Sequence, residues 1–204
     1  MKNLILTYIF STLLLITTPA AAEDGFIEAN THVLVGDGKV VTAEYAWAKG
    51  RLSGFGFVDK SLETGFVITD HEVRANVAGP FYVNAEVGYN RFGGNMGKVG
   101  AGVNLGSLPV VRDKLVYLRI YAQKTIFGPD ADRIIGVSWG TKDLRLTDDV
   151  SMYASGFADF KKNAPDVVEP QLWLKFDDSP IEVGTEVSIF GEQTSMSAAV
   201  KFKF

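Results

Sequence analysis

Apolar and polar residues alternate along most of the chain, from Phe26 to its end. The last ten residues, "SMSAAVKFKF", show the pattern clearly. Every second residue from Met196 to Phe204 is apolar, whereas the residues between them, including Lys201 and Lys203, are small or charged. A period of two places successive side chains on opposite faces of a β-strand. The chain therefore predicts a protein built of strands.

The same alternation recurs in about twelve segments. We predict strands at Ile27–Val35, Val40–Lys49, Leu52–Val58, Phe66–Val77, Phe81–Phe92, Lys98–Leu105, Leu115–Phe127, Arg133–Leu146, Val150–Phe160, Val167–Phe176, Ile181–Phe190 and Ser195–Phe204. The segments between them are rich in Gly, Pro, Asn and Asp, which is typical of hairpin turns. An antiparallel all-β fold follows.

Each predicted strand has one apolar face. In Phe81–Phe92, Val83 and Val87 belong to this face, and Asn84 and Glu86 belong to the opposite one. A soluble sandwich or a lipocalin-like barrel would turn the apolar face inward, whereas a transmembrane barrel turns it outward to lipid. The pattern alone leaves both arrangements open.

The beginning of the chain indicates export. Residues 1–22 contain an early lysine, an apolar stretch from Leu4 to Ile16 and then small residues up to Ala22, which is the layout of a secretory signal peptide. Residues 23–204 contain no apolar run of about 18 residues, so they could enter a membrane only as a closed barrel. The chain has no cysteine and a net charge of -4, which exclude a disulfide framework and argue against nucleic acid as a partner.

Three features favour the transmembrane β-barrel, with about twelve strands and with ten or fourteen as alternatives. The chain ends on Phe204, the polar faces are rich in Gly and Ser, and aromatic residues lie near strand ends. These aromatic residues suit the two interfacial girdles of a membrane barrel: Tyr45, Trp47, Phe81, Tyr89, Phe92, Phe127, Phe160 and Phe176. We expect the last strand to pair with the first and to face lipid.

Three stretches, "VVTAEYAWAKGRLSGFGFVDK", "GFVITDHEVRANV" and "AGPFYVNAEVGYNRF", resemble the nucleoside-specific channel-forming (Tsx-like) family of outer-membrane proteins. The resemblance is carried by Glu44, Tyr45, the run Gly54 to Phe57 ending at Asp59, Glu72, Arg74 and Gly79 to Phe81. It covers residues 40–92 and the last strand, and the loops here are shorter than in the family. It implies a twelve-stranded channel in the outer membrane of a Gram-negative bacterium. The ending at Phe204 also resembles the signal that the barrel-assembly machinery recognises.

The polar faces would line the interior. They carry six acids (Glu44, Asp70, Glu72, Glu86, Glu182 and Glu186), six bases (Arg74, Lys98, Arg119, Lys175, Lys201 and Lys203) and the aromatic residues Tyr82, Tyr117, Tyr121, Tyr153 and Trp173. This balance fits either a lumen closed by ion pairs or a narrow polar channel. As pore-lining and solute-binding residues we predict Glu44, Glu72, Arg74, Tyr82, Glu86, Tyr117, Arg119, Tyr121, Trp173 and Lys175.

The main functional hypothesis is passive diffusion of a small polar solute, with nucleosides first. The alternatives are a closed structural or interaction barrel and, third, a lipid-modifying enzyme. Such an enzyme needs a Ser, His and acid set, but by parity His32 faces the lumen and His71 the lipid. No motif for a metal or a cofactor is present, and the glycines around Gly100 and Gly102 would make room for bulky neighbours. We interpret Asp59 as a turn cap and leave the orientation of Leu52–Val58 open.

Overall fold

The computed structural model describes residues 25–35, 40–90, 94–106, 108–128, 133–161, 164–191 and 193–203, and its side chains except those of 25–35, 90, 164–166 and 203. The predicted signal peptide and Phe204 lie outside this range. The described part of the chain has no helix with the length and apolar character needed to cross a membrane.

The described residues form one antiparallel sheet that closes on itself. Its strands are β1 (Gly25–Val35), β2 (Val40–Lys49), β3 (Leu52–Ser61), β4 (Val67–Ala78), β5 (Phe81–Asn90), β6 (Gly94–Asn104), β7 (Leu115–Phe127), β8 (Arg133–Thr141), β9 (Leu144–Arg145), β10 (Val150–Lys161), β11 (Ala164–Phe176), β12 (Ile181–Phe190) and β13 (Gln193–Lys203). The two residues of β9 pair with Ser151 and Met152 at the start of β10, whereas β8 pairs with the later residues of β10, from Ser155 to Lys161. The wall therefore has twelve strand positions, as predicted.

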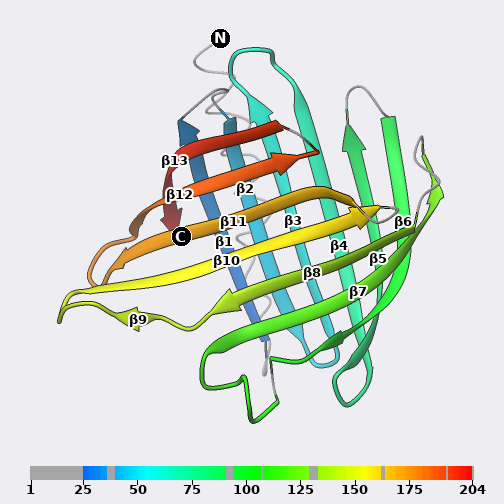
Figure 1. The fold of residues 1–204 in the computed structure, drawn as a ribbon, viewed down its shortest axis with the longest axis horizontal. Helices are drawn as coiled ribbons and strands as arrows, with labels where there is room; N and C mark the ends of the chain where they lie inside the picture. The colour runs from blue at the N-terminus through cyan, green and yellow to red at the C-terminus, as the bar shows by residue number, and fades with distance from the viewer. Residues whose placement is uncertain are drawn as a thin grey trace.

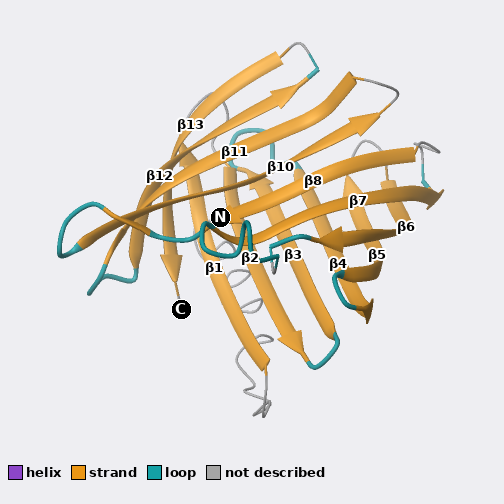
Figure 2. Cartoon of the chain, turned by 60° about the horizontal axis from the view of Figure 1, so that its bottom comes forward, coloured by secondary structure: helices purple, strands orange, loops and turns teal. Residues whose placement is uncertain are grey.

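The last strand closes the barrel against the first. In register, β13 pairs with β1 from Asn30 opposite Lys203 to Val35 opposite Ala198. In Figure 1, β7, β8 and β10–β12 cross in front of β1–β6, and Figure 2 shows that strands make up almost the whole wall. We call rim A the end where β3 joins β4, and rim B the end where β2 joins β3 and β4 joins β5.

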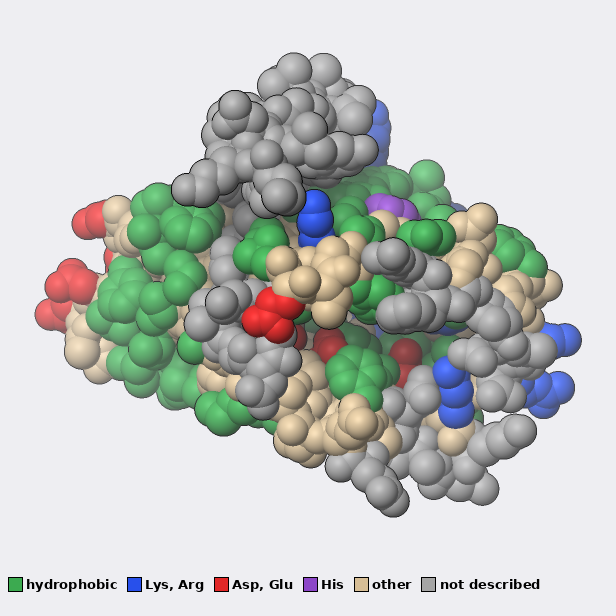
Figure 3. All heavy atoms as spheres, turned by 90° about the horizontal axis from the view of Figure 1, so that it is seen from above, with side chains coloured by type: hydrophobic (Ala, Val, Ile, Leu, Met, Phe, Trp, Pro, Cys, Tyr) green, Lys and Arg blue, Asp and Glu red, His purple; other side chains and the backbone are tan. Residues whose placement is uncertain are grey.

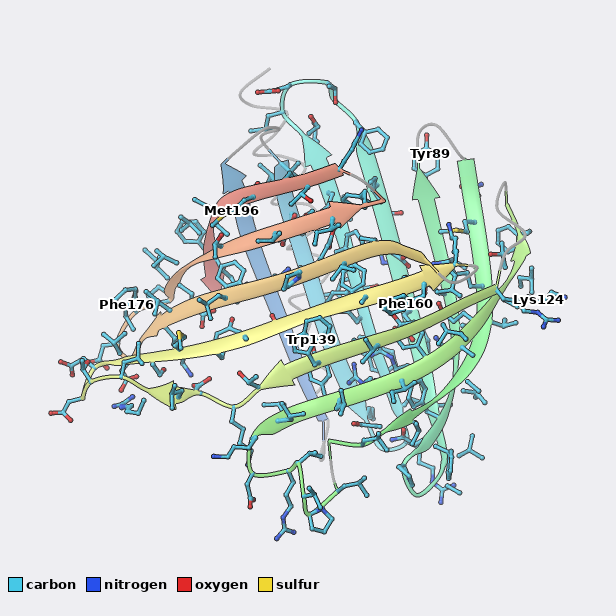
Figure 4. All side chains as sticks on the ribbon, viewed as in Figure 1. Tyr89, Lys124, Trp139, Phe160, Phe176 and Met196 are labelled. Atoms are coloured by element: carbon cyan, nitrogen blue, oxygen red, sulfur yellow. The ribbon has the colours of Figure 1, made fainter. Side chains whose placement is uncertain are left out.

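The barrel is inverted relative to a soluble protein. Along β5, Tyr82 and Glu86 are 3% and 9% exposed, whereas their neighbours Phe81 and Val87 are 60% and 53% exposed. The predicted girdle residues that the structure describes lie on the outside, and Figure 4 shows Phe176 at the outer surface. A polar interior with an apolar exterior is the pattern of a transmembrane β-barrel. The soluble sandwich and the lipocalin-like barrel are therefore excluded.

Two strand predictions need correction. The strand that begins at Leu52 continues to Ser61, so Asp59 lies within β3, and its role as a turn cap is wrong. The strand predicted to run from Arg133 to Leu146 is divided in two: β8 ends at Thr141, and Leu144 and Arg145 form β9, which pairs with β10.

Candidate functional site: the lumen of the barrel

The register of β2, β3 and β4 resolves the orientation that the sequence left open. Phe57 lies directly opposite Glu44 on β2 and Asp70 on β4. Residues directly opposite each other in a ladder share a face. Phe57, and with it Phe55 two residues earlier, therefore faces the lumen beside the predicted acids.

One part of the lumenal wall, on β4–β7, holds carboxylates that are paired with cations. Glu86 on β5 lies directly opposite Lys98 on β6 and forms a buried ion pair with it. The side-chain amide of Gln123 on β7 donates to the other oxygen of Glu86 at 2.8 Å. This arrangement satisfies a buried charge with an opposite charge and a hydrogen bond, which such a charge requires.

A second pair lies on β4 of the same wall. Glu72 forms an ion pair with Arg74, two residues along the strand. The amide of Asn84 on β5 donates to Glu72 Oε1 at 2.6 Å. We call Glu72, Arg74, Asn84, Glu86, Lys98 and Gln123 the paired wall.

The lumenal aromatic side chains lie against glycines of neighbouring strands. A Cβ atom added to Gly102 would come within 2.5 Å of the Tyr82 hydroxyl, and one added to Gly140 within 2.6 Å of the Tyr117 ring. Tyr121 covers Gly136 and Trp173 covers Gly184 in the same way. The rings therefore lie along the wall instead of projecting across the lumen, and the prediction that Gly102 makes room for a bulky neighbour is confirmed.

The outer surface repeats this arrangement on β2–β4. Trp47 covers Gly54, and Tyr45 covers Gly56 together with His71. The hydroxyl of Tyr45 and Nδ1 of His71 are hydrogen-bonded at 2.9 Å, and their rings are stacked. His71 therefore lies on the lipid-facing side, as its parity predicted, and its partner there is a tyrosine.

Cations lie over two of the lumenal rings. The guanidinium of Arg119 is 4.5 Å from the centre of the Tyr117 ring, and Nζ of Lys201 is 4.1 Å from that of Trp173. Such contacts are favourable because the ring face carries partial negative charge. Lys201 Nζ also lies 4.0 Å from Glu44 Oε2 on β2, across β1.

The ten predicted site residues do not form one cluster. Lys175 lies at the rim B end of β11, where its ammonium bonds to Asp143 at 2.9 Å, away from the middle of the lumen. Trp173 is fully buried and Tyr82 nearly so, which leaves little ring surface for a solute. Glu72, Arg74 and Glu86 belong to the paired wall, and Tyr117 and Arg119 form a cation–ring contact. Glu44 lies near Lys201, and Tyr121 donates a hydrogen bond to Asp159.

Three lumenal acids were not predicted: Asp59, Asp159 and Glu169. Asp59 accepts a hydrogen bond from the Thr42 hydroxyl at 2.6 Å, and Asp159 from the Tyr121 hydroxyl at 2.6 Å. Glu169 lies within electrostatic range of Glu186, Asp59 and Asp159. Strand parity could have revealed all three, because each is an even number of residues from a lumenal position. With them, the predicted balance of charges shifts toward acid.

These acids lie toward rim A. Asp59 is two residues before the end of β3, and Asp159 two residues before the end of β10, both at rim A. Figure 3 looks onto the end where β3 joins β4 and shows acidic side chains in a recess between the walls. The described residues contain no group of three or more His, Cys, Asp or Glu arranged to hold a metal ion.

Comparisons with known proteins identify the fold. No family model and no curated protein sequence matches the chain. Among solved structures it is similar to the KdgM porin in complex with disordered oligogalacturonate, with a TM-score of 0.56 and 10% identity over 87% of this chain and 99% of that one. A second structure of the KdgM porin gives a TM-score of 0.53 and 12% identity over the same shares. At such identities the likeness shows the fold, an outer-membrane-type β-barrel, and leaves the solute open.

Proposed function

We propose that this protein is an outer-membrane channel through which small polar solutes diffuse passively. The observation that carries this proposal is the course of the lumenal contacts. Each bonded lumenal pair named above lies within one strand, between adjacent strands, or between strands with a single strand between them. Gln123 with Glu86 and Tyr121 with Asp159 are examples of the last kind. They run along the wall and do not bridge the lumen, and the rings lie flat on glycines.

The alternative, a closed barrel held by ion pairs, is less well supported by this arrangement. It would need opposite charges that meet from opposite walls. The charges that approach each other from distant strands include Asp59 on β3 with Glu186 on β12, and these are both acidic. Like charges repel each other and favour water and mobile ions between them.

The fold supports the same proposal, since two structures with this architecture are of a porin. We propose that residues 1–22 are removed on export, that the apolar exterior contacts outer-membrane lipid, and that the barrel-assembly machinery recognises the last strand. No catalytic step is part of this function.

Nucleosides remain the first solutes to test, on the strength of the Tsx-like motifs around Glu44, Glu72 and Arg74. The described lumen offers two partly exposed rings, Phe55 and Phe57, whose centres are 6.2 Å apart. An aromatic face of this kind can stack with any nucleobase, because every base presents a π-face. The double variant Phe55→Leu/Phe57→Leu keeps the apolar volume but removes these faces.

The test is single-channel current through the refolded chain, residues 23–204, in a planar bilayer. We expect discrete current steps, with saturable block by added nucleoside that the Phe55→Leu/Phe57→Leu variant weakens. Folding of each sample is checked by circular dichroism. A folded, inserted barrel that passes no current would overturn the channel and support the closed structural barrel. Currents without nucleoside block would retain the channel and remove nucleosides as its solutes.

A further inference from the structure

Two sets of lumenal carboxylates differ in their partners. Those of the paired wall bond to Arg74 and Lys98. Asp59, Glu169 and Glu186, on β3, β11 and β12, form no ion pair with a cation among the side chains that the structure describes. Their hydrogen-bond partners are neutral: Thr42 donates to Asp59 at 2.6 Å, and Gln171 donates to Glu186 at 2.7 Å. Lys201 lies within electrostatic range of Glu186 but forms no ion pair with it.

These three acids also act on one another. Glu169 lies within electrostatic range of both Asp59 and Glu186, and Asp59 within range of Glu186. In the narrow interior of a protein such repulsion is stronger than in bulk water, because the surroundings are less polarisable. A water-filled lumen relieves the repulsion by concentrating mobile cations, as charged clefts in proteins do.

An independent feature of the same region also favours cations. Phe55 and Phe57 face the lumen next to Asp59, and neither ring is buried. The face of an aromatic ring attracts a cation, most strongly an organic ammonium that sheds its water easily.

We infer that the lumen selects positively charged solutes over anions, through Asp59, Glu169 and Glu186 and the ring faces of Phe55 and Phe57. This inference rests on the channel proposed above. The acids lie toward rim A, so they act on solutes at that mouth of the channel. The cations Arg74 and Arg119 lie deeper, where Arg74 is paired with Glu72 and Arg119 is stacked on Tyr117.

The test is the reversal potential of the current under a gradient of potassium chloride. We expect potassium to permeate about tenfold better than chloride, the lower end of the enrichment that a charged cleft produces. The variant Asp59→Asn/Glu169→Gln/Glu186→Gln should bring this ratio close to one, because it removes the charges and keeps the side-chain shapes. A matched control, Asp143→Asn/Asp148→Asn/Asp178→Asn, removes three exposed acids at rim B and should leave the ratio unchanged.

A second arm uses methylammonium in place of potassium. Phe55→Leu/Phe57→Leu should lower the permeability of methylammonium relative to potassium and leave the ratio of potassium to chloride unchanged. If the triple variant does not fold, Asp59→Asn alone should reduce the preference for potassium, since asparagine can still accept the Thr42 hydrogen bond. A wild-type channel that conducts without preferring potassium overturns this inference and leaves the channel standing. A barrel that passes no current overturns both.

Discussion

Two regions of the lumen use the same kind of side chain in opposite ways. On the paired wall, Glu86 lies opposite Lys98 and is neutralised by it. On β11 and β12, Glu186 lies opposite Gln171 and Ser197, which are both uncharged. Register, and not residue type, decides whether a lumenal carboxylate stabilises the wall or acts on the solution in the lumen.

We expect the paired wall to govern the stability of the barrel, and the acids outside it to govern transport. A carboxylate buried with its cation belongs to the folded wall, and loss of the partner leaves an uncompensated charge. A carboxylate whose neighbours are neutral groups and other acids is not neutralised, so it contributes to the electrostatic potential of the lumen. Substitutions in the two regions should therefore affect different measurements.

The largest expected effect is on the paired wall. Lys98→Met keeps the length and most of the volume of the side chain but leaves Glu86 buried beside Asp70 without its cation. We expect a loss of about 3–5 kcal/mol in the free energy of unfolding, the usual result of breaking a buried pair. The measurement is reversible urea unfolding in phospholipid vesicles, followed by tryptophan fluorescence.

The control for this variant is Lys124→Met. Lys124 is exposed on the outer surface of β7, as Figure 4 shows, and it forms no ion pair among the described residues. We expect a change of roughly 0.5 kcal/mol or less. Equal losses for the two lysines would contradict the distinction between the paired wall and the rest of the barrel.

A smaller loss of stability is expected when an aromatic ring is displaced from the wall into the lumen. A Cβ atom at Gly140 would meet three atoms of the Tyr117 ring at 2.6 to 3.1 Å and no other residue among its three nearest contacts. Gly140→Ala should therefore cost about 1–3 kcal/mol, as overpacking does, and should reduce single-channel conductance.

The double variant Gly140→Ala/Tyr117→Ala tests the cause. Removal of the ring should restore conductance to at least the wild-type value, so the two substitutions are not additive. Conductance that stays reduced in the double variant would show that the tyrosine ring is not what narrows the lumen.

The alternation of residues predicted the twelve positions, most strand bounds to within a few residues, and the face of nearly every side chain. This succeeded because a closed barrel with a polar interior repeats one rule along every strand. The prediction failed where a strand was judged too short, since ending the third strand at Val58 removed Asp59 from the lumen. Asp159 and Glu169 lie inside predicted strands and were missed although their parity places both on lumenal faces.

The partners of each side chain could not be predicted from one sequence. Parity gives the face, but pairing depends on register between strands that are far apart in the chain. Glu86 and Gln123 belong to β5 and β7, on either side of β6, where Gly100 lies opposite Gln123 and leaves room for its side chain. The Gly–aromatic contacts depend on register in the same way.

The acids outside the paired wall should tolerate substitution. Asp59→Asn keeps the acceptor for the Thr42 hydroxyl and removes a charge that other acids repel. We expect the free energy of unfolding to change by roughly 0.5 kcal/mol or less, in the same urea assay as Lys98→Met. A loss of stability as large as that of Lys98→Met would mean that Asp59 has a structural partner. The distinction between the paired wall and the other lumenal acids would then be wrong.

The smallest expected effect concerns an ion pair at rim B, outside both regions. The guanidinium of Arg145 holds the carboxylate of Asp177 through two contacts, at 2.7 Å and 2.6 Å. The hydrogen bond from Arg145 lowers the pKa of Asp177 below its ordinary value. A lowered pKa means that the pair stabilises the fold above the pKa of the unfolded chain and that this contribution is lost as the pH falls through the folded value. Since the pair is exposed to solvent, the contribution is small.

The measurement is NMR titration of the Asp177 carboxyl, whose midpoint should rise to the ordinary aspartate range in Arg145→Gln. An unchanged midpoint in that variant would show that Arg145 does not hold this carboxylate in solution.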